Sequence, residues 1–171
     1  MGKLNKFILM LFLSGLLAFQ SCRDENENKS APTFAFKDQM MSGKIDDVTW
    51  TKQDGIAEAN TVGQASVLNF AFFTTQPGGS ACQVAFPIKG AHVSFLVVGV
   101  KGLYAITDPD PYKSNGAPSV TITTADGSTI IAKRGAVEIL GISNTTVSGR
   151  IDAYADDQNF VNGNFEVLIC R

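Results

Sequence analysis

Short runs in which apolar and polar residues alternate constrain the fold of this chain most strongly. In the clearest run, Val147, Gly149, Ile151, Ala153 and Ala155 alternate with polar side chains. Successive side chains of a β-strand point to opposite faces, so this run predicts a strand with one buried and one wet face. No stretch after the first thirty residues combines helical spacing with capping residues, and no long helix is expected there.

Related runs recur along the chain and are separated by Gly, Pro, Asn and Asp, which is typical of antiparallel β domains. Asp46 and Asp47 suit the tight turn of a first hairpin between 40–45 and 48–52, because aspartates tolerate unusual backbone angles. About nine or ten such strands predict an all-β domain, either an antiparallel two-sheet sandwich or a partly closed barrel.

Three segments carry more specific expectations. The run 82–88 is expected to be a strand, and 93–100, which is apolar on both faces, is expected to be a strand at the centre of the structure. The segment 107–118 contains three prolines and an Asn-Gly pair and predicts a long surface loop.

The first thirty residues have the layout of an export signal. Lys3 and Lys6 precede the uncharged apolar run 7–18. A bilayer-spanning helix needs about 20 apolar residues, so 1–21 is interpreted as a signal peptide, helical in its apolar part, that is later removed.

Cys22 is the expected site of lipid attachment. It follows Ser21, and the sequence 19–22 resembles the lipobox of bacterial lipoproteins. Several acyl chains on Cys22 would give stable anchoring, since each buried CH₂ contributes about 0.8 kcal/mol. The polar segment 22–33 is then a flexible tether, and 34–171 has the length of one β domain. An ordinary thiol behind a conventionally cleaved signal is the alternative.

Charge argues against a nucleic-acid partner. Two of the 14 Lys and Arg residues lie in the leader, which leaves 12 against 16 Asp and Glu, a net charge of about −4. Because nucleic-acid binding depends on clustered Lys and Arg, and no such cluster exists, we expect no nucleic-acid binding.

The two remaining cysteines, Cys82 and Cys170, would be exported to a compartment that permits disulfides. A bridge between them would stabilise the fold by about 4 kcal/mol in the chain-entropy model. Alternation places Cys170 on the same face as Glu166 and Leu168, so two unpaired thiols are the open alternative.

Several short motifs resemble those of a group of small Bacteroidetes lipoproteins that carry a β-rich domain of unknown function. They are Trp50 after the first turn, Gly102-Leu103-Tyr104, the run 147–155 and Val161-Asn162-Gly163-Asn164-Phe165. The chain departs from that pattern at Ile151, at Asp47 and at Cys170. The resemblance implies an exported location, a lipidated cysteine and a β domain, and it implies no activity.

The sequence offers few combinations of residues that could form a catalytic site. His92 is the single histidine, and a hydrolase triad would have to use it as the base. No nucleophile motif accompanies His92, and the Cys and His spacings of zinc sites are missing. We therefore expect neither a catalytic histidine nor a cofactor.

Two loops hold oxygen ligands of the kind calcium prefers. Asp108 and Asp110 lie in one loop and Asp156 and Asp157 in the other. Turn residues that bond their own backbone are the favoured interpretation of both pairs.

Two tyrosines are the expected ligand contacts. Tyr112 lies in the irregular loop and Tyr154 on the polar face of its strand, where an aromatic ring could stack on a sugar or contact a protein. Trp50 and Tyr104 are expected in or beside the core.

Together these features predict an outer-membrane lipoprotein, periplasmic or surface-exposed, whose β domain is not an enzyme. The expected role is binding of a glycan or protein ligand, or a structural role in the envelope. An envelope enzyme that uses a carboxylate pair or a loop-bound metal, and a subunit of a surface assembly, are the alternatives.

Overall fold

The alternating runs become the strands of one curled sheet in the computed structural model, which describes residues 33–62, 64–74, 81–83, 87–106 and 118–170. The elements of this part of the chain are β1 (Ser42–Ile45), β2 (Val48–Thr51), β3 (Asp54–Val62), β4 (Ala65–Phe73), the short 3₁₀ turn η1 (Ala81–Gln83), β5 (His92–Val98), β6 (Gly102–Ile106), β7 (Val120–Thr123), β8 (Thr129–Ile131), β9 (Arg134–Ile142), β10 (Thr146–Asp156) and β11 (Asn159–Cys170).

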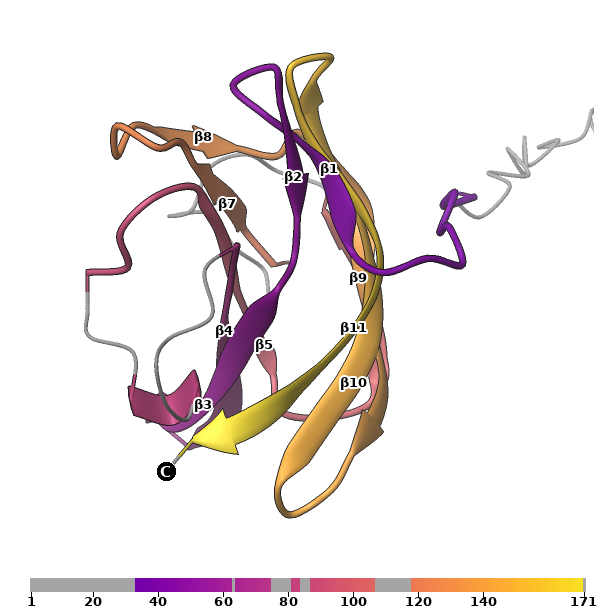
Figure 1. The fold of residues 1–171 in the computed structure, drawn as a ribbon. Helices are drawn as coiled ribbons and strands as arrows, with labels where there is room; N and C mark the ends of the chain where they lie inside the picture. Colours follow the sequence, from indigo (N-terminus) through magenta and orange to yellow (C-terminus); the bar gives the residue numbers. More distant parts are fainter. Residues whose placement is uncertain (1–32, 63, 75–80, 84–86, 107–117, 171) are drawn as a thin grey trace, which may run out of the picture. The chain divides into compact units, whose positions relative to one another are not determined.

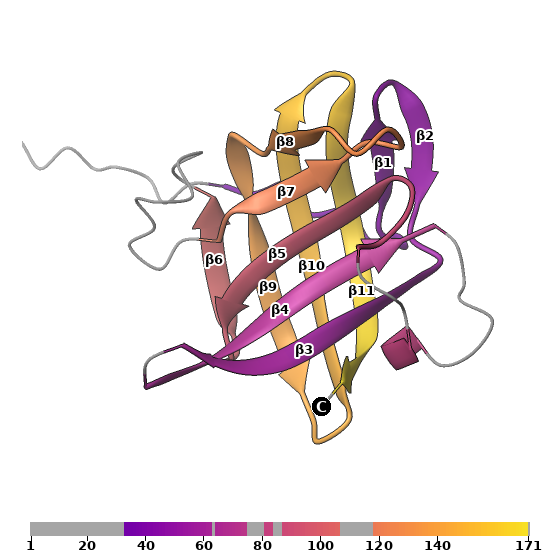
Figure 2. The ribbon, with the colours of Figure 1, turned by 90° about the vertical axis from the view of Figure 1, so that its left-hand side faces the viewer.

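The strands follow the order β6-β9-β10-β11-β3-β4-β5-β7-β8, and β1 pairs with β11 and with β2. Among the pairs of described strands, only β11 and β3 run parallel, over Leu168–Cys170 and Ile56–Glu58, and an isolated bridge between Met40 and Asn164 is also parallel. The sheet curls so that β3, β4 and β5 face β9, β10 and β11 across the interior (Figures 1 and 2). The all-β prediction is confirmed, and the form is an open half-barrel.

The first hairpin turns where the two aspartates predict it. Asp46 and Asp47 have φ angles of 54° and 59° and are the two non-glycine residues of the described chain with positive φ. Positive φ at both central residues is what a two-residue hairpin loop of the common twist requires.

The core lies between the two halves of the curl and is built around phenylalanines. Phe70 and Phe72 of β4 are 0% exposed. Their rings lie 5.6 and 5.1 Å from that of Phe165 on β11, and the Phe70 ring lies 4.6 Å from that of Phe95 on β5. Aromatic pairs at such distances add to the stabilisation from burial. Val147, Ile151 and Ala153, at inward positions of the run 147–155, join the same core, as alternation predicts.

One strand prediction is wrong and another is right only in part. Cys82 lies in η1 and 87–88 lie outside any strand, so the predicted strand 82–88 does not form as such. The strand β5 is present but buries one face, because Leu96 and Val98 are 46% and 37% exposed. No element of the described residues is seen to bury this outer face, so an apolar residue there does not signal a strand buried on both faces.

A disulfide joins Cys82 of η1 to Cys170 at the end of β11, with the two Cα atoms 5.4 Å apart. The turn carries Ala81 onto the outer face of β3 and β4, where it packs with Ile56 and Ala71 in a small second core. Cys170 packs against this cluster, which explains how a cysteine on the outer face of β11 can be paired. The bridge therefore fixes the β4–β5 connection to the last strand.

Candidate binding surface

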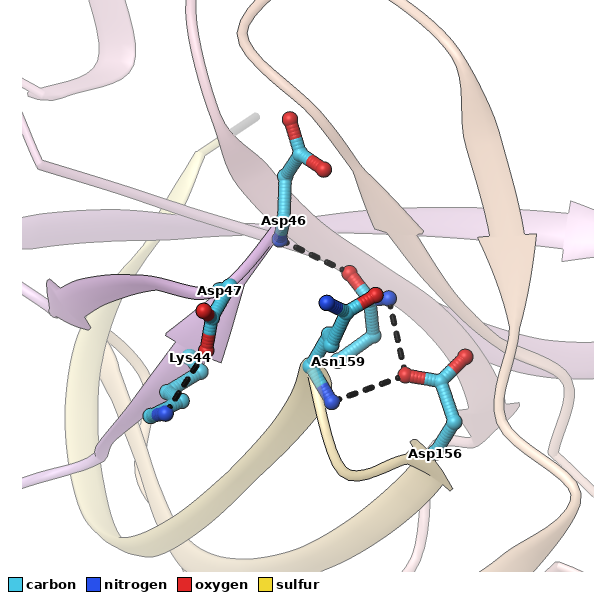
Figure 3. Close-up of polar contacts among 6 residues, drawn as sticks. Lys44, Asp46, Asp47, Asp156 and Asn159 are labelled. Atoms are coloured by element: carbon cyan, nitrogen blue, oxygen red, sulfur yellow. Dashed lines mark hydrogen bonds and ion pairs between the residues drawn. The ribbon is translucent and has the colours of Figure 1, made fainter.

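Two acidic turns lie side by side at one end of the sheet (Figure 3). The Asp46 amide donates to Asn159 Oδ1 at 2.9 Å, and the Asp47 amide donates to the Gln158 carbonyl at 3.1 Å. Asn159 is 5% exposed, so the bond to its side chain is protected from water. The β1–β2 turn and the β10–β11 turn are thus held together as one structure.

The carboxylates of this region are mostly engaged within their own turns. Asp156 accepts from the Gln158 amide at 3.0 Å and from Asn159 Nδ2 at 2.9 Å, and the bond from Asn159 is the main reason that its pKa lies below the ordinary value. Asp157 accepts from the Tyr154 hydroxyl. Lys44 Nζ lies 2.7 Å from Asp47 Oδ1.

These bonds agree with the interpretation of Asp156 and Asp157 as turn residues. Among the residues that the structure describes, no group of three or more His, Cys, Asp or Glu side chains is arranged to hold a metal ion. The other calcium candidates, Asp108 and Asp110, lie outside the described residues.

Tyr154 lies on the outer face of β10, as predicted, but its ring is flanked on both sides. It pairs across the sheet with Arg134 of β9 and with Phe160 of β11. The Arg134 guanidinium lies 3.8 Å from the ring centroid, and the Phe160 ring lies nearly parallel at 6.5 Å. A cation over the ring is a stabilising contact that a stacking sugar would have to displace. The bond to Asp157 raises the pKa of Tyr154.

Trp50 and Tyr104 contribute to structure, as expected. Trp50 is 2% exposed and its Nε1 donates to the Ala91 carbonyl at 3.2 Å. The Tyr104 hydroxyl donates to the carbonyls of Val98 and Val100 at 3.0 and 2.8 Å, and burial raises its pKa. His92 begins β5, with Nδ1 2.9 Å from the Gly90 carbonyl.

A hollow of about 480 Å³ opens beside Trp50, at the end of the half-barrel where the hairpins β1–β2 and β7–β8 lie. Its walls come from four segments that are distant in sequence. The lining residues are Ile45, Asp46, Val48, Thr49, Trp50, Thr74, Gly90, Ala91 and Ala125. The volume falls within the range of small-molecule sites, which often occupy the mouths of β-barrels.

Sequence reasoning missed this hollow. Trp50 and the first turn were recognised as elements of the fold, but Ala91 and Ala125 carry no chemical signal. Their meeting depends on the curl of the sheet. Cys22 and Tyr112, the remaining predicted site residues, lie outside the described part of the chain.

A second depression, of about 610 Å³, lies on the outer face of β9, β10 and β11. Lys52 and Glu166 line it, together with the exposed side chains of Met40 and Leu140. Burial lowers the pKa of Lys52, against the opposing effect of the carboxylates of Asp54 and Glu166.

Comparisons with known proteins add no family. No model of a protein family, no curated protein and no solved structure matches the chain. The described residues contain no helix long and apolar enough to cross a membrane. A functional inference therefore has to rest on the sequence and on the geometry of the surface.

Proposed function

We propose that this chain is an exported lipoprotein, anchored to the outer membrane through Cys22, whose β domain binds a small ligand without catalysing a reaction. The hollow beside Trp50 carries the binding part of the proposal. Its walls are mainly apolar, and Asp46, Thr49 and Thr74 supply the few polar groups that usually orient a ligand.

The anchoring part rests on the leader and on the cysteines. A basic start, a short apolar run and Ser21-Cys22 give the layout of a lipoprotein signal. The bridge between Cys82 and Cys170 suits an oxidising compartment outside the cytoplasm. The resemblance to small Bacteroidetes lipoproteins points the same way. No specific observation favours the enzyme or the assembly subunit, since Asp156 and Asp157 are engaged in turn bonds.

Cys22→Ala is expected to move the protein from the membrane fraction to the soluble fraction, because the acyl acceptor is lost. Fractionation after expression in a bacterium with lipoprotein processing measures this, and intact mass spectrometry of the wild-type protein should show the added acyl chains. Ser30→Ala, in the same tether, should leave the distribution unchanged. An unmodified wild-type Cys22, or a Cys22→Ala protein still held at the membrane, would refute anchoring.

Binding in the hollow can be followed with Trp50, the single tryptophan of the chain. The neutral apolar dye N-phenyl-1-naphthylamine is expected to accept energy from Trp50 in a saturable manner. Ala125→Phe should abolish this transfer, since a phenyl ring would fill space between the hollow's walls.

Ala125 is exposed, so its replacement spares the core, and Ala125→Ser serves as the matched control that leaves the space open. Thermal unfolding checks that both variants are folded. Transfer that is not saturable, or equal transfer in the phenylalanine and serine variants, would contradict ligand binding at this place.

A further inference from the structure

The segment Thr33–Met40, named here the arm, lies along the outer face of β10 and β11 before the chain enters β1. The Ala35 amide donates to Asp152 Oδ2 at 3.1 Å, and the Lys37 amide donates to Asn162 Oδ1 at 2.8 Å. At the end of the arm, the Asn164 amide donates to the Gln39 carbonyl at 2.7 Å. The arm is thus bonded to the sheet along most of its length.

Asn162 is the centre of this contact. Its side chain accepts from the Lys37 amide and donates through Nδ2 to the Ala35 carbonyl at 2.9 Å. It therefore bonds the C=O and N–H of residues two apart, as a neighbouring strand would do. A second bond from Nδ2, to Asp152 Oδ1 at 2.9 Å, fixes the amide in place, and Asn162 is 7% exposed. Both donors and one acceptor of a buried amide are consequently satisfied.

Side-chain contacts and a close backbone approach support the same docking. The Arg150 guanidinium lies 4.4 Å from the centroid of the Phe36 ring, and Asn164 Nδ2 donates to Asp38 Oδ1 at 2.8 Å. Gly163 has a φ of 134°, and a Cβ there would lie 2.7 Å from the Gln39 carbonyl oxygen. The sheet thus leaves room for the arm at a position where any other residue would push it away.

We propose that the arm is a releasable docking segment that sets the length of free chain between the lipid anchor and the β domain. This step rests on the proposed lipidation of Cys22. Release would add the eight residues 33–40 to the length of chain between the anchor and the domain, and no more, because Met41 is 0% exposed and stays in the core. Fully extended, these eight residues span about 28 Å, and as a flexible coil their root-mean-square length is about 15 Å.

Release is feasible because most of the contacts are polar. Each hydrogen bond contributes little net stability in water, and the two phenylalanines of the arm, Phe34 and Phe36, are only half-buried. Local opening of such a segment does not require the core to unfold.

Lys37→Pro tests the docking without changing any residue of the sheet. Proline has no backbone N–H, so the hydrogen bond from residue 37 to Asn162 Oδ1 is lost. Lys37→Ala keeps that N–H and is the matched control. Hydrogen exchange of residues 34–39 in the full chain is expected to be about two- to tenfold faster in Lys37→Pro, while Lys37→Ala matches the wild type. Asn162→Leu removes the side chain that bonds Ala35 and Lys37, and it should give the same faster hydrogen exchange of the arm. Equal exchange in the proline and alanine variants would overturn the docking.

The tether length is read separately, with the lipidated protein in phosphatidylethanolamine and phosphatidylglycerol vesicles that contain dansyl-phosphatidylethanolamine. Energy transfer from Trp50 to dansyl is expected to be lower for Lys37→Pro than for Lys37→Ala, since the longer tether lets the domain move away from the bilayer. Equal transfer despite faster exchange would overturn the proposed control of tether length. Failure of the wild type to bind vesicles would instead count against lipid anchoring, and the exchange result would still decide the docking.

Discussion

Replacement of both Cys82 and Cys170 by alanine is expected to lower the free energy of unfolding of the β domain by about 4 kcal/mol. The bridge joins residues 88 positions apart, and in the chain-entropy model a loop of that size strongly restricts the unfolded chain. It also holds η1 over Ile56 and Ala71, so that its loss should loosen the second core. The midpoint of thermal unfolding should fall by on the order of 10 °C.

Reductant provides the matched measurement on the unaltered chain. Cys82 is exposed, so dithiothreitol can reach the bridge, and the reduced wild type should unfold near the temperature of the double variant. The double variant should not respond to reductant. A wild-type midpoint that is the same with and without reductant, although mass spectrometry confirms reduction, would show that the bridge does not stabilise the domain.

Phe70→Ala is expected to cost about 3–5 kcal/mol, because it removes a fully buried ring from the centre of the core. The ring contacts Phe72, Phe95 and Phe165, which come from three different strands. No neighbour can collapse into the cavity without losing its own partners. Urea unfolding followed by Trp50 fluorescence measures the loss.

Two further variants make the result interpretable. Leu96→Ala removes an apolar side chain from the outer face of β5, where it is 46% exposed, and should change stability by less than about 1 kcal/mol. Phe70→Leu keeps most of the volume and gives a measurable intermediate if Phe70→Ala does not fold. Similar losses for Phe70→Ala and Leu96→Ala would mean that the aromatic cluster is not the energetic centre of the domain.

Sequence patterns predict the turns and strands whose conformation is determined by their own residues. Asp46 and Asp47 located the first turn because the backbone angles of a tight hairpin depend on the turn residues themselves. The run 147–155 located β10 because one of its faces is buried and the other is wet, which is the condition that produces alternation.

Sequence patterns do not predict elements that are stabilised by contacts with residues far away in the sequence. The strand β3 was not predicted, and its sequence Asp54–Val62 is rich in Gly, Ala, Glu and Asn, which have low β propensity. Its pairing with β4 and its cover by η1 stabilise it instead. The position of Cys170 on the same face as Glu166 and Leu168 likewise gave no sign that η1 would shield that end of β11.

The surface chemistry was predictable only in part. Tyr154 was placed correctly on the wet face, but its flanking by Arg134 and Phe160 depends on the register of three strands. The hollow depends on the curl of the whole sheet, which brings Ala91 and Ala125 near Trp50. Neither the strand register nor the curl of the sheet can be predicted from a short stretch of sequence.

The position of β11 has a consequence for the order in which this chain can fold. β11 pairs with β10 on one side and with β1 and β3 on the other, and it carries Phe165 into the core. Strands made early in synthesis therefore keep open edges until Cys170 has been added, and open edges invite pairing with other chains. A nascent chain of this topology therefore cannot complete its sheet before β11 has been synthesised.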